Sequence, residues 1–491
     1  MGVIQRQGIK NTISSYTGII LGFVSLIIIQ PHFLKTEEIG LARVLFAFST
    51  LVASFIPIGS TNMTIKYFPV FKNEKNGHNG FFGFMLLFPL IGFIISSVGL
   101  LVFKEFIIAQ YRKESPLFID YYNYIFSFSL FLAFGTIITT YLIALFKTTV
   151  PSYLNDIYTR VAYIALIFAY YFQYITFKQF IGLYIGIYAF QLLLLIWYLL
   201  REDKPSLTIN WKAFRENNLK EMVSFGLLLS LSSIAALGLK TLDSVLIGKF
   251  LPLSFVGIYA IASFIPTLIE APLNALDRIV TAKVAHAVVD NNMHEVQDIF
   301  YKSVKYLSLI GALLFVGINC NITYLLQLVG KDFQQGVTVV WIISIGSLIN
   351  MMGGANTSII FYSSKYWQGS LLLLSLVIIT FISNMLLIPR LGINGAAAST
   401  ALSSLLYTGI KLFLIHKRFK FQPYNIQTLK IITITLVCLG LNYVLPTLHS
   451  DVVNILLRSV VLGGTFLVAV YLWRIVPEFH HFLPWERGNR Q

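Results

Sequence analysis

The stretch FFGFMLLFPLIGFIISSVGLLV, residues 81–102, decides the fold class because no charged side chain interrupts it. A helix needs about 20 mostly apolar residues to cross a bilayer, and lipid offers no partner to an exposed backbone. Such a run therefore predicts a spanning helix. Similar runs predict about fourteen spans, at 12–31, 40–58, 81–102, 122–145, 157–173, 178–200, 222–239, 254–275, 303–328, 336–362, 367–388, 392–415, 428–445 and 453–474.

The composition agrees with an all-α polytopic membrane protein that has no soluble domain of its own. Hydrophobic residues make up 56% of the 491 positions, and charged residues make up 12%. Soluble domains carry charge at about 25% of positions. The two cysteines, Cys320 and Cys438, lie inside apolar runs, so we expect neither a disulfide framework nor a zinc site.

The distribution of lysine and arginine predicts the orientation of the chain. If the N-terminus is cytoplasmic, basic residues in the cytoplasmic segments outnumber those in the outer segments about threefold. Both termini are therefore predicted to be cytoplasmic. The net charge of +15 then reflects this bias and attraction to anionic membrane lipids. We expect no nucleic-acid partner, since no soluble segment alternates aromatic and basic residues.

An internal repeat predicts how the helices are organised. FLKTEEIG at 33–40 aligns with FLPLSFVG at 250–257, and the register holds without a gap to residues 66 and 283. Two parallel six-helix halves follow, which is an architecture for alternating access. The predicted segments are an N-terminal bundle at 1–200, a cytoplasmic linker at 201–221, a C-terminal bundle at 222–415, and two additional helices with a tail at 416–491.

Charged residues inside spans are the best pointers to a site, because each costs several kcal/mol unless it faces a cavity or a partner. Arg43 and Lys240 are the candidates for contact with substrate. Asp243 and Glu270 are the candidates for ion coupling, and Pro272 frees a backbone carbonyl near Glu270. These side chains have structural alternatives: Arg43 snorkels, Lys240 and Asp243 pair with each other, and Glu270 pairs with a neighbouring hydroxyl.

Two further charges and a set of small polar residues complete the candidates. Lys411 and Arg458 are predicted to snorkel to a membrane interface. Asn350 and Asn356, which lie beside Gly353 and Gly354, are candidates for lining a hydrophilic lumen. Helix packing is the alternative for these residues.

Enzyme signatures are missing from the sequence. It contains no Walker-type glycine loop, no H-E-x-x-H and no metal-ligand cluster. We therefore expect a transporter rather than an enzyme, with no cofactor and no metal. The absence of a nucleotide-binding unit favours secondary transport driven by an ion gradient.

Several motifs resemble one known family. They are Ile9–Thr12, Glu37–Arg43, Gly59–Thr61 with Ile65–Pro69, Ser224–Leu227, Leu242–Gly248, Val256–Tyr259 and Leu391–Thr400. In order and spacing they resemble the polysaccharide-specific transporters of the multidrug/oligosaccharidyl-lipid/polysaccharide (MOP) superfamily, the O-antigen and capsule repeat-unit flippases. Fourteen helices are also similar to the peptidoglycan lipid-intermediate flippases, but helix 1 here lacks the arginines found in those proteins.

The resemblance implies a V-shaped pair of six-helix bundles in the bacterial inner membrane. It further implies an undecaprenyl-pyrophosphate-linked oligosaccharide as substrate, with a glycan polymerase and a chain-length regulator as further partners. Arg43 and Lys240 would serve the anionic pyrophosphate.

Three alternatives stay open at this point. A cation-coupled drug or toxin exporter would share the fold, although helices 13 and 14 speak against it. A membrane glycosyltransferase or polymerase would need a catalytic domain or a large outer loop. A scaffold in a glycan-assembly complex would tolerate neutralisation of Arg43, Lys240 and Glu270.

Overall fold

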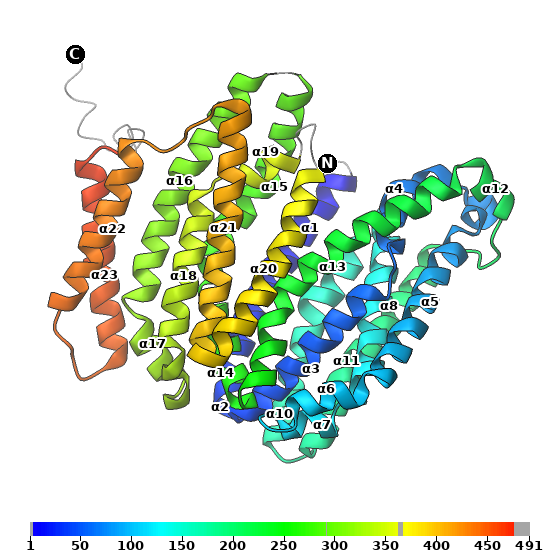
Figure 1. Cartoon of the computed structure of the whole chain (residues 1–491), viewed down its shortest axis with the longest axis horizontal. Coiled ribbons are helices and arrows are strands. Elements are labelled where there is room, and N and C mark those ends of the chain that lie inside the picture. The colour runs from blue at the N-terminus through cyan, green and yellow to red at the C-terminus, as the bar shows by residue number, and fades with distance from the viewer. Residues whose placement is uncertain (1–2, 291, 362–366, 476–491) are drawn as a thin grey trace. The chain divides into compact units, whose positions relative to one another are not determined.

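The computed structural model describes residues 3–290, 292–361 and 367–475, and this part of the chain is helical with no strand (Figure 1). Contacts divide it into two compact units, residues 1–257 and 258–491. The boundary lies beyond α13 (Leu219–Phe250) because that helix packs along α3 (Thr36–Phe55) and α4 (Ser60–Phe71) of unit 1. The predicted division at 201–221 concerns the sequence repeat and stays a prediction.

Unit 1 begins with one continuous helical run of α1 (Val3–Phe23), the π-helix η1 (Val24–Ile29) and α2 (Gln30–Phe33). After α3 and α4, the remaining elements of unit 1 are η2 (Glu74–Gly80), α5 (Phe81–Val102), α6 (Lys104–Tyr111), α7 (Pro116–Asp120), α8 (Tyr124–Ala144), α9 (Thr149–Tyr153), η3 (Leu154–Tyr158), α10 (Thr159–Tyr171), α11 (Phe177–Glu202), α12 (Trp211–Glu216) and α13. Helix α14 (Leu253–Phe264) crosses the boundary between the units.

Unit 2 is a second bundle, in which α18 packs against both α16 and α21 (Figure 1). Its elements are α15 (Thr267–Val289), α16 (Met293–Asn319), α17 (Ile322–Val329), η4 (Lys331–Gly336), α18 (Val337–Met352), α19 (Asn356–Phe361), α20 (Trp367–Leu391), α21 (Ile393–Phe419), α22 (Ile426–Val444) and α23 (Asp451–Leu472). The last two helices pack on each other and on α16, and Cys320 and Cys438 are buried in that contact.

Most of the predicted spans are present as helices. Among the described residues, 12 helices are long and apolar enough to cross a membrane, or 13 if Leu253–Phe264 and Thr267–Asp277 form one span bent by 49°. The predicted span 157–173 is helical but is not among them, and its helical run carries Asp156 and Arg160. The polytopic all-α prediction is confirmed.

Besides 254–275, which bends between Phe264 and Thr267, two predicted spans are broken in the structure. The run 336–362 contains a break between α18 and α19, where Gly354 adopts φ +58°. The run 303–328 ends a first helix at Asn319 and begins a second at Ile322. Asn321, in that break, donates from its amide to the Gly317 carbonyl at 2.8 Å and to Ser459 at 3.2 Å. Polar side-chain bonds of this kind compete with the helical backbone, and hydropathy alone does not register them.

The two copies of the repeat share local geometry. Leu34 ends α2 with an extended backbone at φ −125° and ψ 149°, and Leu251, its repeat equivalent, ends α13 at φ −136° and ψ 157°. Gly40 and Gly257 are also equivalent, and each lies against the other's helix. A Cβ at Gly40 would overlap the Leu253 carbonyl, and a Cβ at Gly257 would overlap the Thr36 carbonyl. Glycine at both positions is thus required by a reciprocal backbone contact.

Candidate functional site

A buried lysine marks a polar region inside unit 2. Lys411 on α21 is only 2% exposed, and its Nζ donates to Thr357 Oγ1 at 2.9 Å. The ammonium also lies 4.0 Å from the centroid of the Tyr407 ring. The prediction that Lys411 snorkels is wrong, because Thr357 and Tyr407 hold its head group inside the bundle. A buried ammonium is costly unless acids compensate it.

Two carboxylates supply this compensation. Glu270 and Asp277, both on α15, lie close enough to Lys411 for their charges to interact with it. Glu270 is also hydrogen-bonded to Ser347 and Asn350 on α18. The predicted pairing of Glu270 with a hydroxyl is therefore present, and Glu270 also interacts with the charge of Lys411. We call Lys411, Glu270 and Asp277 the charge cluster.

Polar neighbours from the helix break border the charge cluster. Asn350 accepts from Thr408 Oγ1 at 3.4 Å, and Asn356 accepts from Thr357 Oγ1 at 3.1 Å. The Asn356 amide nitrogen is buried and has no hydrogen-bond partner within the described part of the chain. Since an unpaired buried donor costs about 1–3 kcal/mol, it is a place where a polar ligand or water gains a bond.

Unit 1 has its own polar interior, which includes Arg43. This residue is partly buried on α3, and its charge interacts with the phenol groups of three tyrosines on α10 and α11: Tyr163, Tyr184 and Tyr188. Arg43 therefore lies against α10 and α11 within the bundle. The three phenols surround it with polar oxygens without supplying a full negative charge.

Sequence reasoning missed Arg160, which lies in the same polar interior of unit 1. Its charge interacts with Tyr188 and Asp156, and its guanidinium packs against α1. A Cβ at Gly22 would come within 3.2 Å of Arg160 Nη1 and Cζ. The available signal was a basic residue inside the predicted span 157–173.

The other two predicted residues of unit 1 lie on α13. Lys240 is exposed, and Asp243, one turn later, is partly buried. The structure thus divides the predicted residues into two groups: Arg43, Lys240 and Asp243 belong to unit 1, whereas Glu270, Asn350 and Asn356 belong to unit 2. It brings Glu270 and Asn350 into direct contact.

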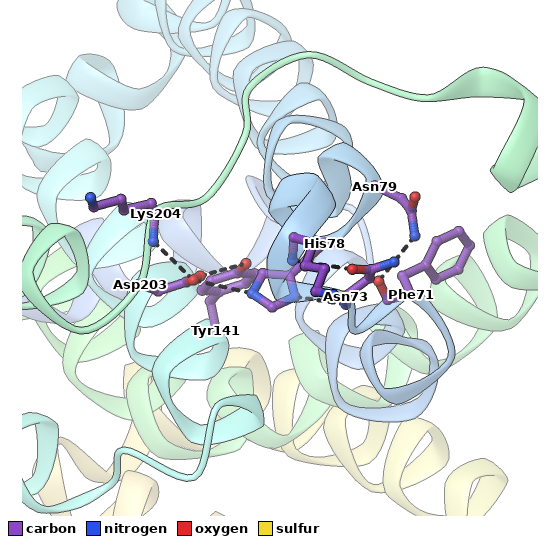
Figure 2. Close-up of polar contacts among 8 residues, drawn as sticks. Phe71, Asn73, His78, Asn79, Tyr141, Asp203 and Lys204 are labelled. Carbon is purple, nitrogen blue, oxygen red and sulfur yellow. Dashed lines mark hydrogen bonds and ion pairs between the residues drawn. The ribbon is translucent and has the colours of Figure 1, made fainter.

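A third polar group, shown in Figure 2, lies at the end of unit 1 that carries η2 and the predicted linker. Buried His78 bonds through Nε2 to Asp203 Oδ1 at 3.1 Å, and its Nδ1 accepts from the Asn73 backbone at 3.1 Å. Tyr141 donates to the second oxygen of Asp203 at 3.3 Å. Because Nδ1 accepts, the histidine proton sits on Nε2. These contacts fasten the linker to the turn before α5, and no motif in the sequence indicates them.

Comparisons with known proteins agree with this architecture. A family model described as "Polysaccharide biosynthesis protein" matches residues 32–335. Among solved structures, the lipid II flippase MurJ in an inward closed conformation matches with a TM-score of 0.76 at 14% identity, covering 95% of this chain and 99% of that chain. No curated protein matches the sequence.

Two transporters of the MATE type also share the fold. An inward-facing multidrug resistance MATE transporter of the MOP superfamily matches with a TM-score of 0.63 at 13% identity, covering 82% of this chain and 94% of that chain. A MATE transporter from Vibrio cholerae matches with a TM-score of 0.56 at 14% identity, covering 86% and 99%. Because the family model covers more than half of the 491 residues, the chain belongs to the polysaccharide biosynthesis protein family and has the fold of the MOP superfamily.

Proposed function

We propose that this protein is a flippase that moves an undecaprenyl-pyrophosphate-linked oligosaccharide, an O-antigen, capsule or exopolysaccharide repeat unit, across the bacterial cytoplasmic membrane by alternating access. Membership in the polysaccharide biosynthesis family and a fold shared with a lipid II flippase support the proposal. The observation that carries it is the charge cluster. A purely structural membrane bundle has no need to bury a lysine with two acids, and intramembrane charges mark transport pathways.

The charge cluster supports coupling to an ion gradient. With both carboxylates ionised and the lysine protonated, Lys411, Glu270 and Asp277 carry a net charge of −1. A buried site is most stable when its charges cancel. One proton or one sodium ion would neutralise it, which is the property expected of an ion-coupling site. In this proposal Glu270 receives the ion, and Asn350 orients the carboxylate.

Arg43 and Lys240 are suited to bind the anionic pyrophosphate. An arginine that can present two parallel N–H donors suits phosphate oxygens, whereas a lysine acts as a point charge. Arg43 is partly buried beside three phenols, which leaves it less hydrated than a surface arginine. Asp243 stays a second candidate for coupling on α13. Both termini are proposed to face the cytoplasm.

The test combines gene deletion with chemistry. Deletion in the native host is expected to abolish the surface polysaccharide and to trap lipid-linked repeat units in the inner leaflet, measured by leaflet-selective labelling of extracted glycans. Complementation with Glu270→Gln should restore protein level but not surface glycan, since the cluster is then neutral without an added ion. Unchanged surface glycan with raised sensitivity to cationic compounds would instead establish an exporter.

A further inference from the structure

Unit 1 has an open pocket of about 650 Å³ at the end where α2 joins α3 and α10 joins α11. In Figure 1 the labels of α2 and α10 lie at the same end of this unit. Its volume falls within the range of about 300–1,000 Å³ that is typical of small-molecule sites. Both connections are predicted to be outer loops, so the pocket would face the compartment that receives the translocated glycan.

Aromatic side chains form one wall of the pocket. Tyr171 and Tyr174 line it and are 52% and 81% exposed, so their ring faces are available to a ligand. Phe33, which also lines it, packs edge-on against Tyr171 with ring centroids 4.8 Å apart, and this contact holds Tyr171 in place. Exposed tyrosines also occur in the aromatic belts of ordinary membrane proteins. Tyr171 and Tyr174 differ from such belt residues because they line a pocket that also contains polar groups.

The polar wall offers both donors and acceptors. Tyr170 donates to Glu38 Oε1 at 2.6 Å, and the Lys35 backbone donates to Oε2 at 2.9 Å, which fixes the carboxylate. Gln179 accepts from the Thr176 backbone through Oε1 at 2.8 Å, an arrangement that turns its amide group into a donor for a ligand. His32 Nδ1 bonds to the Ile28 carbonyl at 2.6 Å, so its Nε2 is an acceptor.

This combination fits a sugar ring. A pyranose has an apolar C–H face that stacks on aromatic rings, and its rim of hydroxyl groups needs both donors and acceptors. Lys35 and Glu38 also balance each other in charge, which favours a neutral sugar over an anionic one. We propose that this pocket binds neutral pyranose units, so that the glycan of the translocated lipid is held at the outer face. The binding site stands on its geometry, and only its physiological role rests on the proposed function.

Saturation-transfer NMR on the purified full-length protein in nanodiscs tests the site directly. The probes are methyl glucoside, methyl galactoside and N-acetylglucosamine. We expect transfer to at least one of them. Tyr174→Ala should weaken its binding about two- to twelvefold, because an aromatic contact is worth about 0.5–1.5 kcal/mol. Tyr174→Phe should retain binding, since the ring face is unchanged.

Tyr153→Ala is the matched control. Tyr153, on α9 of the same unit, is 53% exposed and does not line the pocket. No transfer to any of the three sugars, or equal weakening by Tyr174→Ala and Tyr153→Ala, would overturn the proposal. Sugar binding in a protein whose deletion leaves surface glycan intact would refute the proposed function but keep the pocket. Loss of surface glycan on deletion, in a protein that binds none of the sugars, would keep the proposed function and refute the sugar-binding pocket.

Discussion

Replacing Lys411 with methionine should destabilise the protein far more than replacing an exposed lysine. The side chain is 2% exposed and interacts with two carboxylates. Removing it leaves the partly buried Glu270 and Asp277 without their cation. Breaking a fully buried pair costs about 3–5 kcal/mol, which is the upper bound for this site. Glu270→Gln should be much milder, because Lys411 and Asp277 then balance each other.

The triple substitution Glu270→Gln, Asp277→Asn and Lys411→Met should recover most of the stability lost in Lys411→Met. Replacing every charge of a buried cluster is often nearly neutral, whereas removing one partner is not. The assay is the apparent unfolding midpoint of the purified protein in one detergent at a fixed heating rate, because unfolding of such proteins is commonly irreversible.

Lys302→Met is the matched control. Lys302 is 65% exposed and pairs with Asp298 at 2.8 Å one turn earlier on α16, and a surface pair of this kind contributes about 0.3–0.5 kcal/mol. If Lys411→Met unfolds at the same midpoint as Lys302→Met, or if the triple variant is no more stable than Lys411→Met alone, the charge of Lys411 is not balanced by Glu270 and Asp277.

Three further predictions follow from other parts of the molecule. Gly354→Ala should lower the apparent unfolding midpoint in the same assay, because the residue has φ +58°, a conformation that costs a non-glycine residue about 1–3 kcal/mol, and a Cβ would lie 2.6 Å from Val304 Cγ2. Gly409→Ala, with no atom within 4 Å of its Cβ, should not lower it. Arg43→Ala should abolish surface glycan in the complementation assay and Arg43→Lys should restore only part of it, whereas full activity of Arg43→Ala would exclude a role in substrate contact. His78→Ala should speed amide hydrogen exchange in the linker after Asp203 several-fold by releasing it from η2, while exposed His449→Ala should leave the exchange unchanged, and equal rates would mean that the His78–Asp203 contact does not hold the linker.

Hydropathy predicts the helical architecture well because the bilayer imposes a simple length rule. Runs such as 81–102 and 428–445 became the helices Phe81–Val102 and Ile426–Val444 within a few residues. The rule is less informative where side-chain bonds compete with the helix, as at Asn321, and where glycine permits a left-handed turn, as at Gly354. Hydropathy averaged over a window of about 20 residues does not register such single positions.

The charge cluster could be predicted only in part. Glu270 and Asn350 were both named from the sequence, and they are hydrogen-bonded to each other. The burial of Lys411 was not foreseen, because an intramembrane lysine near a helix end ordinarily snorkels. What prevents it here is contact with Thr357 and Tyr407, and the position of Thr357 depends on the break after α18. Tertiary contacts of this kind are not encoded in a local pattern.

Reconstitution of the purified protein in proteoliposomes would measure directly whether it moves a lipid-linked glycan across a bilayer. The vesicles carry an undecaprenyl-pyrophosphate-linked oligosaccharide from the native host, and a membrane-impermeant glycosidase or lectin reports how much of it is reachable from outside over time. We expect protein-dependent flipping that an imposed proton or sodium gradient accelerates and that Glu270→Gln uncouples from the gradient. Accessibility that changes no faster than in protein-free vesicles, with or without a gradient, would contradict it.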